Sequence, residues 1–238
     1  TEVETELPAS HRAGVYNILI AGTDGDGYRT DTIIVAHLDE NTHEVALMSV
    51  PRDTAVMNGN NGLMKINAVY ANGKEEGMER LERRLSSLLG FEMDGYVLVN
   101  LDAFVKIVDL VGGVTVNVPQ DMYYSDPGQN LYINLREGYQ HLDGAKAEQF
   151  VRYRSGYVTG DIGRGNAQKL FISAFIKSLT TSLANADASM ITTLAGNVIN
   201  YVKTDMSVAD IVYFGKSFLG IGKGDGVKLE NISLMTMP

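Results

Sequence analysis

The residues best suited to chemistry form an arginine-rich stretch at positions 149–168. Arg152 and Arg154 alternate with apolar or aromatic neighbours, so an extended backbone would send both guanidinium groups to the same face. Arg164 follows a glycine-rich turn, and Gln168 lies one helical turn later. Arginine offers bidentate hydrogen bonds and a helix N-terminus offers free N–H groups, so the stretch suits a phosphate or pyrophosphate. The alternative is a surface loop whose arginines pair with nearby acids.

Two acidic residues lie in the polar segment after the first apolar run. That run, Tyr16 to Ala21, predicts a buried strand, and Asp24 and Asp31 bracket the segment that follows it. Two carboxylates there could share a hard divalent cation such as Mg²⁺, which often binds through one or two carboxylates plus a substrate phosphate. The simpler alternative is that both are turn residues, with Asp31 paired to Arg29.

Another arginine stands where a third expected strand, residues 44–50, runs into Pro51. Proline ends the strand, because it cannot donate to a sheet hydrogen bond. Arg52 and Asp53 come next, and an ordinary ion pair between them is the simplest expectation.

Composition excludes several classes of protein. The chain has 238 residues and a formal net charge of -9, so general nucleic-acid binding is not expected. It has no cysteine, which excludes disulfides and thiolate metal sites. No apolar run approaches the roughly 20 residues of a membrane span. Residues 1–14 are expected to be a polar, juxtamembrane tail, and residues 15–238 a single domain, because neither a repeat nor a break in composition divides them.

The elements that must position these residues alternate in type. A strand, a helix and a strand are expected in succession over residues 95–118, which indicates an α/β fold with layers of helices on a sheet. Residues 33–50 predict a hairpin, and residues 77–90 a helix with one apolar stripe. The polar, aromatic segment 120–130 is expected to be a mobile flap.

The last third of the chain is dominated by apolar helices. Helices are expected at 170–183, 190–202 and 208–219, and a final strand at 227–235. These helices could simply cover the sheet, or they could wall a long apolar pocket. The same residue types serve both purposes, so both alternatives stay open.

Eight short motifs occur in an order that resembles one known family. They are G-T-D, R-T-D-T, V-P-R-D-T, K-I-N-A-V-Y, G-G-V-T-V-N-V, L-D-G, V-R-Y-R and G-D-I-G-R…Q. Together they resemble the LytR-CpsA-Psr family, the glycopolymer ligases of Gram-positive cell walls. The resemblance runs from about Tyr16 to Gln168 and is weaker towards the C-terminus.

The resemblance implies a three-layer α/β/α sandwich with a central mixed sheet flanked by helices. It also implies a place on the outer face of the cytoplasmic membrane, tethered by an N-terminal transmembrane helix that this sequence does not include. The activity implied is transfer of a glycopolymer, such as teichoic acid or capsular polysaccharide, from a polyprenyl-pyrophosphate carrier to a hydroxyl of peptidoglycan or another envelope polymer. Mg²⁺, or Mn²⁺ in its place, would assist, and an apolar tunnel would hold the lipid.

Two other activities fit the same residues. A polyprenyl-pyrophosphate pyrophosphatase would use water in place of the sugar hydroxyl, and a non-catalytic module would only bind the polyprenyl phosphate. A nucleotide-binding role is disfavoured, because the chain lacks both the G-x-x-x-x-G-K-[ST] motif and a G-x-G-x-x-G motif after a strand.

The resemblance also assigns roles residue by residue. Asp24 and Asp31 match the acidic metal positions. The catalytic positions are Arg52, Asp31, Arg152 and Arg154, and the substrate-binding positions are Arg29, Lys65, Arg164 and Gln168. One departure stands out, since many members have an arginine immediately before the glutamine and this chain has Ala167. This departure implies either the loss of one phosphate contact or a different headgroup, with Arg136 or Arg29 as the residue that would compensate.

Overall fold

The structure is a computed structural model of the chain. It describes residues 13–23, 27–58, 62–71, 75–154, 156–157, 161–183, 186, 188–219 and 229–237. The chain divides into two compact units, one made of Thr1–Leu101 with Ala195–Pro238 and the other of Asp102–Leu194. The single domain expected over residues 15–238 stays a prediction.

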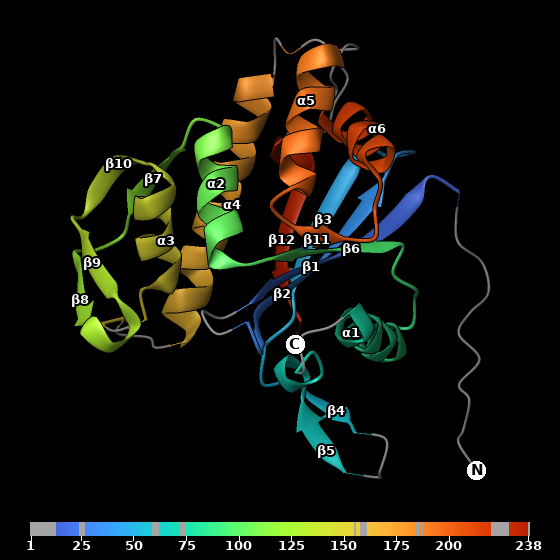
Figure 1. The fold of residues 1–238 in the computed structure, drawn as a ribbon, viewed down its shortest axis with the longest axis horizontal. Coiled ribbons are helices and arrows are strands. Elements are labelled where there is room, and N and C mark those ends of the chain that lie inside the picture. Colours follow the sequence, from blue (N-terminus) through green and yellow to red (C-terminus); the bar gives the residue numbers. More distant parts are fainter. Residues whose placement is uncertain are drawn as a thin grey trace. The chain divides into compact units, whose positions relative to one another are not determined.

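A mixed six-stranded sheet forms the centre of the first unit (Figure 1), in the order β11-β6-β1-β2-β3-β12. Its strands are β1 (Val15–Thr23), β2 (Thr30–Asp39), β3 (Glu44–Ser49), β6 (Gly95–Val99), β11 (Lys203–Thr204) and β12 (Ile232–Thr236). β1 runs antiparallel to β2 and parallel to β6, and β3 runs antiparallel to β2 and parallel to β12. The predicted mixed sheet is therefore confirmed.

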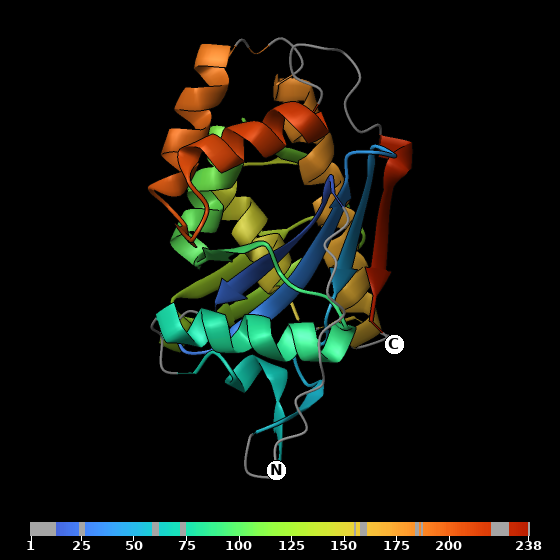
Figure 2. The same ribbon diagram turned by 90° about the vertical axis from the view of Figure 1, so that its right-hand side faces the viewer.

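Helices cover both faces of this sheet, as Figures 1 and 2 show. Leu81 and Leu85 of α1 (Glu75–Leu89) are fully buried in one core cluster with Leu19 of β1. Tyr16 lies on the opposite face of β1, since side chains alternate along a strand. Its ring meets Phe214 of α6 (Val208–Leu219) edge-on, with ring centroids 5.1 Å apart. The unit is thus the α/β/α sandwich that the sequence predicted.

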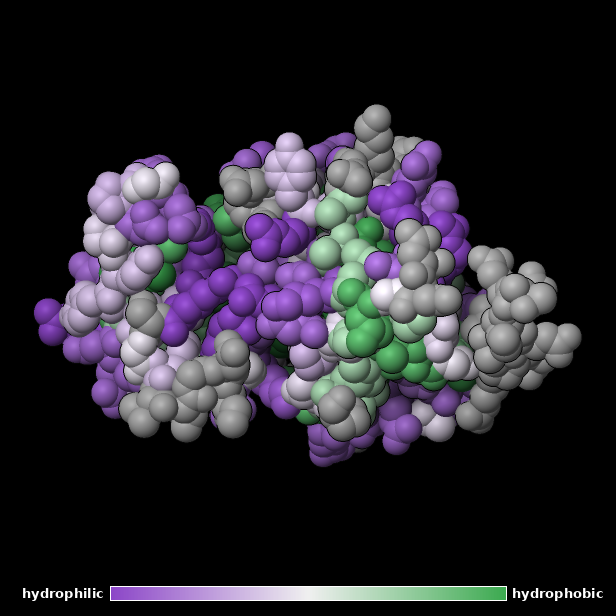
Figure 3. All heavy atoms as spheres, turned by 90° about the horizontal axis from the view of Figure 1, so that it is seen from below, coloured by the Kyte–Doolittle hydropathy of each residue, from purple (hydrophilic) through white to green (hydrophobic). Residues whose placement is uncertain are grey.

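A short hairpin, which the sequence did not predict, belongs to the same unit. It pairs β4 (Ala55–Met57) with β5 (Leu63–Lys65) and leads into the 3₁₀ turn η1 (Ile66–Ala68). The hairpin lies lowest in Figure 1. Figure 3 shows the molecule from below, and on this face hydrophobic and hydrophilic residues occupy separate areas. Met57 and Leu63 are paired across the hairpin and are 49% and 70% exposed.

The second unit combines helices with two small antiparallel sheets, β7–β10 and β8–β9. Its elements are α2 (Leu101–Leu110), β7 (Val114–Val118), β8 (Met122–Asp126), η2 (Pro127–Gln129), β9 (Leu131–Leu135), β10 (Gly138–Leu142), α3 (Gly144–Arg152) and α4 (Asp161–Leu183). α5 (Ala188–Ile199) links it to the first unit, and η3 (Leu229–Asn231) precedes β12. The irregular flap predicted at residues 120–130 is wrong, because β8 and η2 give this segment regular secondary structure.

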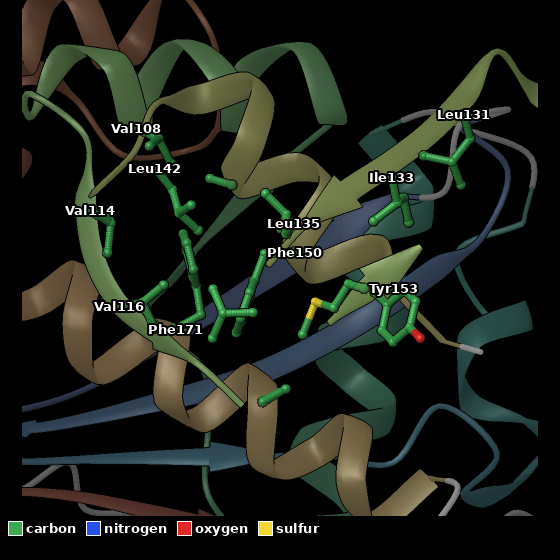
Figure 4. Packing of buried hydrophobic residues seen from close by; sticks show 14 residues of the cluster. Val108, Val114, Val116, Leu131, Ile133, Leu135, Leu142, Phe150, Tyr153 and Phe171 are labelled. Atoms are coloured by element: carbon green, nitrogen blue, oxygen red, sulfur yellow. The ribbon is translucent and has the colours of Figure 1, made fainter. Parts of the chain in front are cut away.

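One hydrophobic core holds the second unit together (Figure 4). Phe150 of α3 and Phe171 of α4 are almost fully buried, with ring centroids 6.0 Å apart. β7 and β9 contribute every second residue to this core, among them Val116 and Ile133, and turn the residues between outward. Ala167 belongs to the same cluster.

The L-D-G motif seats α3 against α2. Asp143 caps α3, its Oδ1 accepting from Lys146 N at 2.9 Å. The next residue is Gly144, whose N–H donates to Asp109 Oδ1 at 2.7 Å. A Cβ at Gly144 would overlap the carbonyl oxygen of Val105, so the two helices can approach this closely only at a glycine.

Candidate functional site

An ion pair joins the ends of two neighbouring strands in the first unit. Arg52 Nη1 donates to Asp31 Oδ1 at 3.0 Å, and the two side chains are 29% and 26% exposed. Asp31 stands at the start of β2, and Arg52 follows β3. The ion pair expected between Arg52 and Asp53 is much looser, with Nε and Oδ2 3.9 Å apart.

The backbone around Arg52 is held from both sides. Val50 N donates to Ile33 O at 2.9 Å, which continues the β2–β3 pairing up to Pro51. Asn67 N donates to Arg52 O at 3.2 Å, so η1 anchors the arginine itself. Pro51 ends the strand, and Arg52 turns back towards β2. The backbone position from which the Arg52 side chain extends is therefore fixed.

Arg52 keeps a hydrogen-bond donor for a ligand. Its Nε is buried and has no hydrogen-bond partner within the described residues. An unsatisfied buried donor is uncommon, and an arginine needs an acceptor such as a phosphate oxygen to satisfy it.

Lys65 joins this cluster through Asp53. Lys65 Nζ lies 2.6 Å from Asp53 Oδ1, and both side chains are more than half exposed. Ile66 N donates to Thr54 O at 2.8 Å, which ties the end of β5 to the turn that carries Arg52. Two cations and two carboxylates therefore alternate along this edge, and their formal charges cancel. An added pyrophosphate would need further positive charge.

Thr30 is a member of the site that sequence reasoning missed. It is fully buried where the pairing of β1 with β2 shifts register, and its hydroxyl has no hydrogen-bond partner in the part of the chain that is described. It precedes Asp31 in the R-T-D-T motif, which was the available signal. Arg29, one residue earlier, is exposed, and Asp24 lies outside the described residues.

Arg152 lies in the second unit and is paired within it. Its Nη1 lies 2.8 Å from Glu148 Oε1, one turn earlier in α3, and its Nη2 donates to Gln129 Oε1 at 3.5 Å. The extended backbone assumed for Arg152 is wrong, since it is the last residue of α3. Strong helix formers precede it, and a cation at a helix C-terminus is stabilised by the helix dipole. Only beyond it, at Tyr153, is the backbone extended, and Arg154 follows, exposed.

Arg164 and Gln168 lie on the first turns of α4, both half-buried. Their spacing of four residues places them on the same helix face, as predicted. Ala167 is only 5% exposed and packs in the core with Phe171, one turn later. Arg136 is exposed in the turn between β9 and β10, and its compensating role stays a prediction.

Two hollows of different character lie in the first unit. One, of about 480 Å³, is lined by apolar residues of β5 and η1 and by Arg80, Arg83 and Arg84 of α1. The other, of about 270 Å³, is lined by polar and apolar surface in about equal parts, with Met78, Leu98 and Met206 beside Lys203 and Thr204. Within the described residues no helix is both long and apolar enough to cross a membrane.

The described residues include few carboxylates that could hold a metal ion. No group of three or more histidine or acidic side chains there is arranged to bind an ion. Asp31 alone supplies oxygen ligands at the predicted metal position, since Asp24 is not described. A magnesium ion commonly binds one or two carboxylates together with substrate phosphate oxygens and water, so Asp31 fits such a role.

Comparison with known proteins agrees with this fold. A sequence model of the LytR_cpsA_psr family matches residues 1–235. The "Polyisoprenyl-teichoic acid--peptidoglycan teichoic acid transferase TagV" of Bacillus subtilis is 31% identical over 205 residues, which cover 82% of this chain and 51% of that protein. TagU of Oceanobacillus iheyensis, which carries the same transferase description, is 32% identical over 81% of this chain and 59% of its own length. The chain thus spans between half and three-fifths of these relatives.

A solved structure shares the architecture. The crystal structure of B. subtilis TagV superimposes with a TM-score of 0.74 at 24% sequence identity, over 96% of this chain and 86% of that chain. At that identity the likeness establishes the fold.

Proposed function

The chain belongs to the LytR_cpsA_psr family, and from this premise we propose that it transfers a glycopolymer from a polyprenyl-pyrophosphate carrier to a hydroxyl of peptidoglycan. The transferase descriptions of TagV and TagU support the reaction. The single observation that carries the proposal is the Arg52–Asp31 pair at 3.0 Å, beside which Arg52 Nε has no hydrogen-bond partner among the described residues. It combines a donor for phosphate with a carboxylate at one strand edge.

Arg52 and Lys65 bind the pyrophosphate and offset its charge, which otherwise repels an oxygen nucleophile. The acceptor hydroxyl attacks the phosphorus next to the glycan, the bond from that phosphorus to the bridging oxygen breaks, and polyprenyl phosphate leaves. Asp31 accepts the proton of the hydroxyl. Arginine forks stabilise charge that builds up on the phosphoryl oxygens, an effect that commonly contributes a factor of about 10²–10³ in rate.

Arg152, Arg154, Arg164 and Gln168 of the second unit are assigned to the same pyrophosphate by their match to the family motif. The three arginines would bring positive charge to the phosphates, and the Gln168 amide would add a hydrogen bond. Asp31 and Asp24 would hold Mg²⁺, or Mn²⁺ in its place, and a bound ion would supply further charge neutralisation at the phosphate. The apolar side of the hollow lined by Met78 and Leu98 offers space for part of the lipid.

We place the protein in the envelope of a Gram-positive-type bacterium, on the outer face of the cytoplasmic membrane, where lipid carrier and peptidoglycan meet. A membrane tether preceding this sequence would keep it there. The transferred polymer would be a teichoic acid, as the descriptions of both relatives suggest, or a capsular polysaccharide.

The test is product analysis. Purified protein is incubated with a synthetic short-chain polyprenyl-pyrophosphate sugar and peptidoglycan fragments, with Mg²⁺ or with a chelator, and the products are read by mass spectrometry. A phosphosugar adduct on the acceptor that depends on Mg²⁺ is expected. Free sugar phosphate without adduct would make the protein a pyrophosphatase, and binding without either product would make it a lipid-binding module.

A further inference from the structure

The outward face of the β8–β9 ribbon is unusually aromatic. Tyr123 and Tyr132 are 51% and 56% exposed, although the opposite side of the ribbon lies in the hydrophobic core. Neither ring meets another aromatic ring, and neither hydroxyl finds a partner, among the residues that the structure describes. About half of the surface of each tyrosine side chain is therefore open to a ligand.

The strand register places a polar side chain opposite each tyrosine. Tyr123 is paired with Asn134, and Ser125 with Tyr132. All four are exposed, and they form two successive rungs on one face. Directly opposed residues have Cβ atoms about 5 Å apart and diagonal ones about 7–8 Å, so the two rings flank a hydroxyl and an amide.

The ribbon is held rigid, which lowers the entropic cost of binding. Asp126 Oδ1 accepts from Gly128 N at 3.0 Å and closes the turn between the strands. Asn134 N donates to Gln149 Oε1 at 2.9 Å and fixes β9 to α3. Gln129, in the turn between the two strands, accepts from Arg152 Nη2. The ribbon is therefore connected to a residue that we propose to bind phosphate.

We propose that this face, the tyrosine platform formed by Tyr123, Ser125, Tyr132 and Asn134, binds the glycan strand of the peptidoglycan acceptor. The negative face of an aromatic ring attracts the weakly positive C–H edge of a sugar ring, and the amide and hydroxyl bond to its acetamido and hydroxyl groups. This inference rests on the proposed function and names how the acceptor is held.

Charge selects the acceptor over the transferred polymer. Residues 120–143, which contain the platform, carry four acids and one arginine, a formal charge of -3. A polyanionic teichoic acid is repelled by such a surface, whereas the amino-sugar backbone of peptidoglycan is uncharged and is not.

A binding measurement tests the platform without any catalysis. The probe is a soluble hexamer of β-1,4-linked N-acetylglucosamine, titrated into wild-type protein by calorimetry. We expect Y123A and Y132A each to weaken binding about tenfold and the double variant to abolish it. The matched control is Y139A, since Tyr139 is 82% exposed but lies on β10, in the other small sheet. Circular dichroism checks that each variant is folded.

The outcomes separate this inference from the proposed function. Wild-type affinity in the double variant would overturn the platform, as would competition by soluble teichoic acid at lower concentration than the hexamer. A wild-type dimer that the double variant converts to monomer, seen by sedimentation, would make the face a self-association surface instead. If the wild type binds the hexamer through these tyrosines but transfers nothing, the transferase proposal fails and the platform stands.

Discussion

Arg52 reaches from the end of β3 to Asp31 at the start of β2, with 3.0 Å between Nη1 and Oδ1. The two residues are 21 positions apart in the chain, and the rest of β2, a turn and β3 lie between them, so a hairpin brings the two charges together. Neither the simple turn role expected of Asp31 nor the pairing of Arg52 with its chain neighbour describes this arrangement.

The lysine substitution R52K tests the geometry, because it keeps the charge and removes the forked donors. We expect transfer activity to fall about 10²-fold, since the single nitrogen of lysine cannot reproduce the separate, planar donors with which arginine spans Asp31 and a phosphate oxygen. R83K is the matched control, as Arg83 pairs loosely with Glu79 at 3.7 Å on the exposed side of α1. Turnover rates of the two variants are compared, and equal rates would remove Arg52 from the reaction.

Replacing Arg152 or Arg154 by alanine is expected to abolish transfer while leaving the fold intact. The pair between Arg152 and Glu148 is an i,i+4 helix pair, so its loss costs only about 0.5 kcal/mol of stability. Thermal unfolding and the mass-spectrometric transfer assay are run on the same preparations. Full activity in both variants would rule out the assignment of these arginines to the pyrophosphate.

The arginine that the family resemblance implies at position 167 is expected to harm this chain. Ala167 is buried beside Phe171, and A167R would force a guanidinium into a packed apolar core, at a cost of about 3 kcal/mol. Q168R, on the half-buried face one residue on, is the control and should cost less than about 1 kcal/mol. Urea unfolding measures both, and an A167R protein as stable as wild type would mean that the side chain finds a route out to solvent.

Stability should fall between pH 4.5 and 7 because of Glu82 on α1. Burial raises the pKa of this carboxyl to about 7, helped by the nearby carboxylates of Asp205 and Glu79 and opposed by Arg83. In this window the folded protein holds a proton that the unfolded chain, with an ordinary pKa of 4.5, has released. The free energy of unfolding therefore decreases as pH rises, by about 1 kcal/mol for a partly exposed group, and levels off above pH 7.

The variant E82Q removes that titration. Its unfolding free energy should exceed the wild-type value at pH 8 and match it at pH 4, as measured by urea unfolding at both values. A constant difference at every pH would show that the effect comes from packing rather than from the proton.

The spacing of hydrophobic residues predicted much of the fold. Alternating and helical patterns gave the main strands, the hairpin of β2 and β3 and the helix α1, because each buries one continuous apolar face. Three-residue strands such as β4 and β5 are too short to show a period. The helix predicted from residue 170 begins earlier, at Asp161, because the core contacts of Ala167 and Phe171 outweigh the low helix propensity of two glycines in its first turns.

Some residues of the candidate site were predicted from the sequence, but their contacts were not. Residue types in short motifs pointed to Arg52, Asp31 and Lys65, but pairing across 21 residues depends on strand register, which the motifs do not contain. Thr30 was overlooked although it belongs to the R-T-D-T motif, because a motif does not reveal that its hydroxyl is buried without a hydrogen-bond partner among the described residues. The helical position of Arg152 was missed because the alternation V-R-Y-R fits a strand as well as the end of a helix.

The glycine of the L-D-G motif acts at a distance from the chemistry. Gly144 begins the helix that ends at Arg152, eight residues and about 12 Å further along the axis. Any side chain at Gly144 would push this rigid rod away from α2, and a small tilt at its base becomes a larger displacement at its tip. Substitutions at Gly144 should therefore displace Arg152, the proposed phosphate-binding residue at the other end of the helix, without contacting it.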